Sequence, residues 1–223
     1  MTIPIVALDV STLDEAKGLM RELAGVIRYY KVGLQLFMAE GSGAVRAVEK
    51  AGAQVFLDLK LLDIPQTVER AVREAGRMGA NAVSIHLWGG AQMVHAACAQ
   101  GNRPLVWGVS VLTSLKDADL KVLGGRTAHD MVPEVAAMGA AQGMDGVVCS
   151  GEEVARVRAV APTLGIITPG IRAQADARGD QARVVTAAQA RDAGATYVVV
   201  GRPITAAAER LVAELGGESA ASR

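Results

Sequence analysis

Residues 193–201 read Ala-Gly-Ala-Thr-Tyr-Val-Val-Val-Gly, and they contain the repeating signal from which the fold can be predicted. Gly194 marks the end of a helix-forming segment, because glycine adopts the left-handed conformation of helix C-caps at little cost. The apolar run Tyr197–Val200 predicts a strand covered on both faces, as in a parallel sheet flanked by helices. The same helix-to-strand signal is expected at Ala51-Gly52-Ala53, Met78-Gly79-Ala80 and Met138-Gly139-Ala140.

Strand-like and helix-like segments alternate along the whole chain. Eight such units without a composition break are typical of a single-domain α/β fold, the (β/α)8 TIM barrel, and fit it better than an open doubly wound sheet. We therefore predict a barrel domain over residues 1–215 and a polar C-terminal tail over 216–223. The strands are expected over 3–9, 26–33, 54–60, 80–87, 104–112, 145–149, 164–168 and 196–201.

The composition argues against several classes of partner. Of the 223 residues 51% are hydrophobic, and 23 Lys and Arg residues balance 23 Asp and Glu residues. No net charge therefore attracts nucleic acid or an anionic membrane. No apolar stretch reaches the ~18 residues of a membrane span, and no signal-peptide pattern precedes the run Ile3–Leu8, so we expect a cytoplasmic protein. Cys98 and Cys149 are too few for a disulfide framework and are expected to be core residues.

Residues 54–60, Gln-Val-Phe-Leu-Asp-Leu-Lys, form the predicted strand that most suggests chemistry. Strand alternation places Asp58 and Lys60 on one face and the apolar residues Val55, Leu57 and Leu59 on the other. Burying charges is costly unless they are paired or used, so packing does not explain them. Asp63 lies beyond the strand, where alternation no longer fixes its direction. It could join a functional site, or it could be the N-cap of a helix beginning near Pro65.

Other polar residues are expected on the same rim, because active sites of TIM barrels lie at the carboxyl ends of the strands. A single charge such as Asp9 or Lys31 at a strand end is more often part of a surface ion pair. Together with Asp58 and Lys60, however, these residues favour a ligand site. His86 is interpreted as a hydrogen-bonded wall residue. The predicted rim residues are Asp9, Lys31, Asp58, Lys60, His86, Thr113, Arg172, Gln181, Gly201 and Arg202.

Gly201-Arg202-Pro203 has the chemistry of a phosphate site. Gly201 permits close approach of the backbone, Arg202 supplies a planar fork of donors, and Pro203 can start a helix whose first amides face the rim. The loops after the seventh and eighth strands are the usual phosphate site of this fold, which favours phosphate binding over an ordinary turn. The polar loop 172–183 could close over a ligand or could be merely mobile.

Seven motifs spread over essentially the whole chain form a family pattern: Asp9, Tyr30-Lys-Val-Gly33, Asp58-Leu-Lys-Leu-Leu-Asp-Ile-Pro65, Val111-Leu-Thr-Ser114, Thr168-Pro-Gly-Ile-Arg172, Gly179-Asp-Gln181 and Val200-Gly-Arg-Pro-Ile-Thr205. The pattern resembles the orotidine 5′-phosphate decarboxylase family. Its Asp-x-Lys-x-x-Asp core is shared with sugar-phosphate decarboxylases and synthases, whereas Lys31 and the Gly-Arg-Pro-Ile-Thr segment are more specific. The chain departs from the family at Leu62, Gln66 and Trp88, none of them in the charged array.

The resemblance implies decarboxylation of orotidine 5′-monophosphate to UMP, the last step of de novo pyrimidine synthesis, without a metal or an organic cofactor. It implies that Lys60 stabilises the carbanion and protonates C6, with Asp58, Asp63 and Lys31 completing the catalytic set. It also implies a homodimer in which Asp63 reaches the partner's site. The implied substrate-binding residues are Asp9 and Lys31 at the ribose, Thr113 at the pyrimidine, Arg172, Gln181, Gly201 and Arg202 at the phosphate, and also Asp58, Ile64 and Thr67.

Two other functions fit parts of the sequence. A sugar-phosphate decarboxylase or synthase of the same superfamily uses the same motif with a magnesium ion, but those enzymes carry an acidic ligand at the position of Lys31. A lysine there would repel the metal, because magnesium is bound by oxygen ligands. A non-catalytic nucleotide-binding barrel is the other alternative. Such a protein has no need of the Lys60 ammonium beside the Asp58 carboxylate.

Overall fold

A computed structural model describes residues 2–124, 126–171 and 186–201 of the chain, together with Ala208, Leu211, Val212 and Leu215. The predicted phosphate residues Arg172, Gln181 and Arg202, the predicted loop 172–183 and the predicted tail 216–223 lie outside these described residues.

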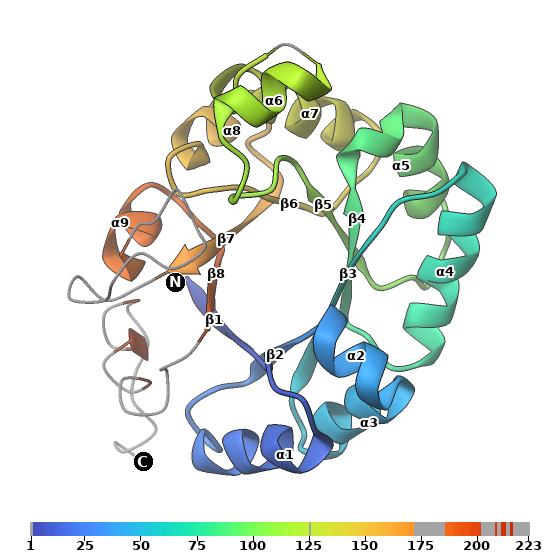
Figure 1. Cartoon of the computed structure of the whole chain (residues 1–223), viewed down its shortest axis with the longest axis vertical. Helices are drawn as coiled ribbons and strands as arrows, with labels where there is room; N and C mark the ends of the chain where they lie inside the picture. Colours follow the sequence, from blue (N-terminus) through green and yellow to red (C-terminus); the bar gives the residue numbers. More distant parts are fainter. Residues whose placement is uncertain are drawn as a thin grey trace.

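Eight parallel strands of the described chain close into a barrel in sequence order (Figure 1). β1 pairs with both β2 and β8, so the sheet has no open edge. The predicted (β/α)8 barrel is thereby confirmed, with strand ends shifted by a few residues. The strands are β1 Ile3–Ala7, β2 Tyr29–Gly33, β3 Gln54–Leu61, β4 Ala82–His86, β5 Leu105–Val109, β6 Gly146–Val148, β7 Gly165–Ile171 and β8 Tyr197–Val200.

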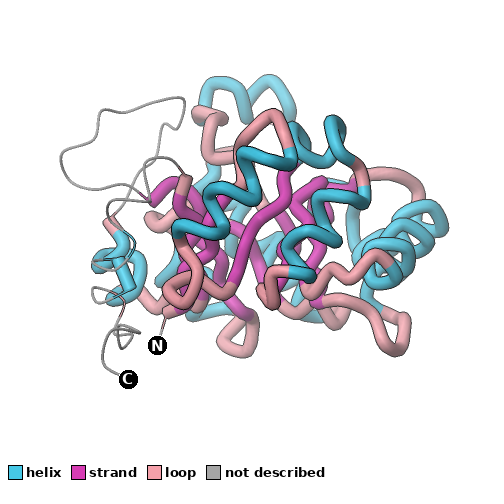
Figure 2. Tube along the Cα trace, turned by 90° about the horizontal axis from the view of Figure 1, so that it is seen from below, coloured by secondary structure: helices cyan, strands magenta, loops and turns pink. Residues whose placement is uncertain are grey.

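Helices surround the strands, which run through the centre of the molecule in a side view (Figure 2). In α4, the apolar residues Val68, Val72 and Ala75 lie at helical spacing and are buried against the barrel. No helix among the described residues is long and apolar enough to cross a membrane. The helices are α1 Leu13–Glu22, α2 Leu34–Glu40, α3 Ser42–Lys50, α4 Pro65–Arg77, α5 Gly90–Cys98, α6 Asp117–Leu123, α7 Ala128–Ala141, α8 Val154–Val160 and α9 Ala187–Asp192, with the 3-10 helix η1 over Leu87–Gly89.

Of the four glycine-containing segments predicted to mark helix ends, three follow a helix as predicted and the fourth does not. Gly52, Gly79 and Gly194 follow α3, α4 and α9, and each has a positive φ angle. Gly139 instead lies inside α7, which continues for two further residues. A Cβ atom at Gly139 would lie 2.5 Å from Met144 Cε, so this glycine permits close packing. Gly143, with a φ angle of 84°, follows the helix in its place.

An aromatic cluster fills the barrel interior below the carboxyl ends of the strands. The Trp107 ring centroid lies 4.5 Å from that of Phe56 and 4.9 Å from that of Tyr197. Burial raises the pKa of the neighbouring Tyr29 well above its ordinary value, so this phenol stays neutral. Cys149 is buried and Cys98 is partly buried against the outer core, as predicted for both. The aromatic layer leaves space for a ligand toward the carboxyl ends.

Candidate active site

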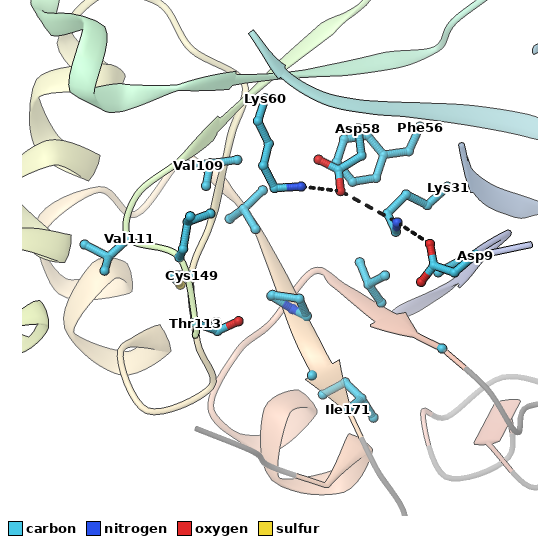
Figure 3. A pocket seen from close by; sticks show the side chains of 17 residues that line it. Asp9, Lys31, Phe56, Asp58, Lys60, Val109, Val111, Thr113, Cys149 and Ile171 are labelled. Atoms are coloured by element: carbon cyan, nitrogen blue, oxygen red, sulfur yellow. Dashed lines mark hydrogen bonds and ion pairs between the residues drawn. The ribbon is translucent and has the colours of Figure 1, made fainter. Parts of the chain in front are cut away.

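Four predicted site residues form a row of ion pairs with alternating sign (Figure 3). Lys31 Nζ lies 3.0 Å from Asp9 Oδ1 and 3.8 Å from Asp58 Oδ2. Lys60 Nζ donates to the same Asp58 Oδ2 at 2.9 Å. Each charge therefore has an opposite charge beside it, which offsets the cost of removing it from water.

The strands place these charges at one end of the barrel. Lys31 and Asp58 lie near the carboxyl ends of β2 and β3, two residues beyond the aromatic Tyr29 and Phe56. The side chains of Lys31 and Asp58 are only 13% and 11% exposed. Asp9 lies two residues beyond the end of β1, although a strand was expected to include it, and its side chain is 46% exposed. The row therefore runs from a buried centre to more exposed ends.

Lys60 reaches Asp58 by a route that strand alternation did not predict. The Lys60 φ angle is 51°, and Asn102 is the one other non-glycine residue with a positive φ among the described residues. The register of β3 against β4 shifts here, because Leu57 pairs with Val83 and Leu61 pairs with Ile85. Three residues of β3 therefore lie opposite one residue of β4, Ser84. A bulge of this kind redirects side chains at functional sites.

Ser84 is a site residue that the sequence analysis missed. Its hydroxyl accepts a hydrogen bond from the Lys60 backbone N–H at 2.8 Å and donates one to Asp58 Oδ1 at 2.8 Å. A lone serine in the apolar run Ala82–His86 gave no signal of this role. On the same strand, His86 accepts a 3.4 Å hydrogen bond from the Trp88 backbone N–H, as predicted, but it is not among the residues that line the cavity, although it was expected as a wall residue. Burial, and then the charge of Lys60, lower the His86 pKa below its ordinary value.

A cavity of about 530 Å³ opens beside the charged row. Its size is that of a site for a small molecule. Thr113 and Gly201, both predicted at the rim, also line it. The opposite wall is apolar and was not predicted as part of the site. Its residues include Val109, Val111, Val148, Pro169 and Ile171.

Asp63, Ile64 and Thr67 lie on the outer surface and are not among the residues that line the cavity of their own chain. Ile64 is 65% exposed, and Asp63 Oδ1 accepts a 2.6 Å hydrogen bond from the Ile64 backbone N–H. The N-cap of α4 is Ile64, and no side chain caps this helix. The interpretation of Asp63 as the N-cap of α4 is therefore wrong.

A closed barrel that holds paired ammonium and carboxylate groups beside a cavity at the carboxyl ends of its strands has the architecture of a TIM-barrel enzyme. Over residues 2–215 the chain matches the model of the Orotidine 5'-phosphate decarboxylase / HUMPS family, and it belongs to this family. The resemblance stated from the sequence motifs is confirmed.

Curated relatives and solved structures agree with this membership. The chain is 46% identical over 215 residues to the orotidine 5'-phosphate decarboxylase of Nitratidesulfovibrio vulgaris, covering 92% of this chain and 91% of the relative. It is 42% identical over 225 residues to that of Pseudomonas aeruginosa, covering 95% and 97%. The crystal structure of the enzyme of that name from Lactobacillus acidophilus superposes with a TM-score of 0.84 at 29% identity, covering 97% of this chain and 100% of that chain. The relatives are carboxy-lyases by name, which confirms the expectation of an enzyme.

Proposed function

We propose that the chain catalyses the decarboxylation of orotidine 5′-monophosphate to UMP in pyrimidine synthesis. The names of its relatives support the substrate. The observation that carries the proposal is the Lys60 ammonium, which lines the cavity and lies 2.9 Å from the Asp58 carboxylate. An ammonium has three N–H donors, so one bond to Asp58 leaves capacity for a ligand.

Lys60 has the chemistry that this reaction requires. When the bond from C6 of the pyrimidine to the carboxylate breaks, CO2 leaves and the electron pair remains on C6, in the plane of the ring. The π-system cannot absorb this charge, so a fixed positive charge beside C6 stabilises the transition state. The Lys60 ammonium then transfers a proton to C6 and becomes an amine, which regains a proton from water.

Asp58 and Lys31 would hold Lys60 in place and contact the substrate. The Asp58 carboxylate lies between the ammonium groups of Lys31 and Lys60. It can therefore orient Lys60, while Lys31 compensates the negative charge of Asp58. A substrate carboxylate beside Asp58 would be repelled, and this repulsion would be relieved as CO2 leaves. Asp9 and Lys31 would bind the ribose, Thr113 the pyrimidine, and Gly201 with Arg172, Gln181 and Arg202 the phosphate.

The charged row also supports a reaction without a metal ion. Lys31 Nζ lies between the carboxylates of Asp9 and Asp58, at 3.0 and 3.8 Å, where a metal of a related sugar-phosphate enzyme would need acidic ligands. A cation already neutralises these carboxylates.

We further propose a homodimer in which Asp63 serves the partner's site. Apolar side chains are exposed just after three neighbouring strands: Leu34 and Met38 in α2 after β2, Leu62 and Ile64 after β3, and Trp88 in η1 after β4. Met38 is 80% exposed, although burial of such a side chain stabilises a protein. A second copy packed on this side would bury these residues and receive Asp63, Ile64 and Thr67 near its own cavity. Asp63 would then extend the row of alternating charges beyond Lys60.

Coexpression of two inactive variants tests the shared site. Asp63→Ala and Lys60→Ala chains, each expressed alone, should have little turnover. In a heterodimer, one of the two sites would combine Lys60 of one chain with Asp63 of the other. Because half of randomly formed dimers are mixed, about a quarter of the wild-type activity should return. Absence of any recovery in demonstrably mixed dimers would show that Asp63 acts within its own chain or not at all.

The absorbance change of orotidine 5′-monophosphate on addition of purified protein in EDTA tests the reaction itself, because the orotate and uracil chromophores differ. Rapid loss of the orotate signal with UMP as the product is expected. Activity that needs magnesium and a sugar phosphate would instead indicate the related metal-dependent enzymes. Nucleotide binding without any product would indicate a binding protein.

A further inference from the structure

The bulge in β3 creates a problem of hydrogen bonding that one side chain solves. Between the pairs Leu57 with Val83 and Leu61 with Ile85, three residues of β3 face one residue of β4. The regular ladder of backbone hydrogen bonds is interrupted there, and a buried backbone N–H without a partner is unfavourable. The Lys60 N–H finds its acceptor in the Ser84 hydroxyl, at 2.8 Å.

Lys60 itself has an unfavourable backbone conformation that needs support. Its φ angle of 51° lies in the left-handed region, where the Cβ atom of a residue other than glycine is crowded. Such conformations persist at functional sites when the surrounding structure holds them in place. The hydrogen bond from the Lys60 N–H to Ser84 acts on the residue that carries this strain.

Ser84 also fixes the orientation of the Asp58 carboxylate. The Ser84 hydroxyl donates to Asp58 Oδ1 at 2.8 Å, while Asp58 Oδ2 accepts from Lys60 Nζ at 2.9 Å. With Oδ1 held by Ser84, the carboxylate turns Oδ2 toward the two ammonium groups. Ser84 has 0% exposure, so water does not compete for either of its hydrogen bonds.

We propose that Ser84 is a positioning residue, whose hydroxyl holds the Lys60 backbone and the Asp58 carboxylate in the one arrangement that aims the Lys60 ammonium into the cavity. Ser84 is not among the residues that line the cavity, so it acts through Asp58 and Lys60. A hydroxyl suits the position because it donates and accepts at the same time. The proposal rests on the proposed function, in which Lys60 performs the chemistry.

The first test compares two buried serines: Ser84 lies in β4, and Ser110 directly follows the neighbouring strand β5. Ser84→Ala removes both hydrogen bonds of the positioning hydroxyl. Ser110→Ala is the matched control, because Ser110 also has 0% exposure and its hydroxyl donates to the Val148 carbonyl at 2.8 Å. We expect Ser84→Ala to lower kcat about 10- to 100-fold with little change in KM, because small displacements of catalytic groups have effects of that size. Ser110→Ala should keep kcat near the wild-type value.

A second pair of variants separates the hydroxyl from side-chain volume. Ser84→Thr and Ser84→Val add nearly the same bulk, but only threonine keeps a hydroxyl. Threonine should retain most of the activity that valine loses, and this comparison stands even if the alanine variant does not fold. Equal kcat values for the two would overturn the proposal, as would a wild-type kcat in Ser84→Ala.

Amide hydrogen exchange at Lys60 tests the same hydroxyl without any turnover. Exchange of the Lys60 N–H should accelerate in Ser84→Ala and Ser84→Val relative to Ser84→Thr and Ser110→Ala, because its acceptor is lost. Unchanged exchange in both hydroxyl-free variants would overturn the positioning role whatever the activity. If the wild-type chain left orotidine 5′-monophosphate unchanged, the proposed function would be wrong, and the exchange experiment would still decide the role of Ser84.

Discussion

Ion pairs occupy both ends of this barrel, but their surroundings differ. Before β5 and β6, Arg103 pairs with Asp145 and also donates to the carbonyls of Cys98, Pro104 and Gly143. Asp145 Oδ2 accepts a further 2.7 Å hydrogen bond from the Val106 backbone N–H. At this amino end, the charged groups are bound to the backbone that they hold together.

At the carboxyl end, the charged row faces open space instead. Asp9, Lys31, Asp58 and Lys60 bond to each other and line the cavity. Within the part of the chain that the structure describes, Ser84 is the one side chain outside the row that hydrogen-bonds to a side chain of the row. An ion pair that is surrounded by backbone groups, as at the amino end, therefore stabilises the fold. An ion pair that borders a cavity, as at the carboxyl end, is available to a ligand. This division agrees with the general rule that TIM barrels carry chemistry at one face and stability at the other.

The largest expected effect is on turnover, at the carboxyl end. Lys60→Ala should lower kcat by about 10⁴-fold or more, because it removes both the electrostatic stabilisation and the proton donor. The midpoint of chemical denaturation should barely change, because Asp58 keeps Ser84 and Lys31 as partners. Steady-state kinetics and denaturation of the same preparation measure both. Lys17→Ala, at a surface pair with Asp14 on α1, is the control. Near-normal turnover in Lys60→Ala would refute the assigned proton donor.

The amino end should show the opposite response. Asp145→Ala leaves Arg103 without its carboxylate and the Val106 N–H without its acceptor, so the free energy of unfolding should fall by about 2–4 kcal/mol. The kcat at a temperature where the variant is folded should stay within a few-fold of wild type. Urea denaturation and kinetics measure the two effects. Glu134→Ala, which breaks an exposed pair with Arg126, should destabilise much less. A kcat loss as large as that of Lys60→Ala would erase the distinction between the two ends.

The sequence predicted the barrel and the charged row because both follow from local patterns. Apolar runs and glycine-containing helix ends recur in each unit, and strand ends are where TIM-barrel sites lie. Regular strand alternation correctly predicted that the Asp58 and Lys60 side chains lie together, but the structure brings them together through a bulge in β3. The pattern Leu-Asp-Leu-Lys-Leu over residues 57–61 has the alternation of a regular strand, and nothing in it signals the bulge or the positive φ at Lys60.

The unpredicted parts depend on residues far apart in the chain. Ser84 contacts Asp58 across 26 positions, and Arg103 contacts Asp145 across 42. A serine in an apolar strand and an arginine before one are common local features. Their roles appear only when the closed sheet brings their partners beside them. Asp63 is a comparable case, because its proposed partner is a second copy of the chain.

A smaller effect separates charge from geometry at the amino end. Arg103→Lys keeps the positive charge but loses the planar fork that reaches several acceptors at once. The free energy of unfolding should fall by about 1–2 kcal/mol, less than for Asp145→Ala, since the carboxylate remains paired. Arg73→Lys, at an exposed pair with Glu69 on α4, serves as the matched control in urea denaturation. A loss equal to that of the control would mean that charge alone explains the Arg103 network.

The smallest expected effect is a pH dependence of stability at the carboxyl end. Burial, and then the Lys60 charge, lower the His86 pKa in the folded protein below its ordinary value of 6.5. As pH falls below 6.5, this histidine becomes protonated in the unfolded chain while it stays neutral in the folded chain. Stability should therefore be full above pH 6.5 and decline as pH falls toward the folded pKa.

Urea denaturation at a series of pH values, compared with His86→Gln, isolates this contribution. The variant should show a flatter pH dependence than the wild-type protein, because the residue whose pKa is shifted is gone. Lys60→Ala should flatten it partly, because one of the two causes of the shift is removed and burial remains. If Lys60→Ala left the His86 contribution unchanged, the positive charge of the row would not reach beyond Asp58, and burial alone would set the state of this histidine.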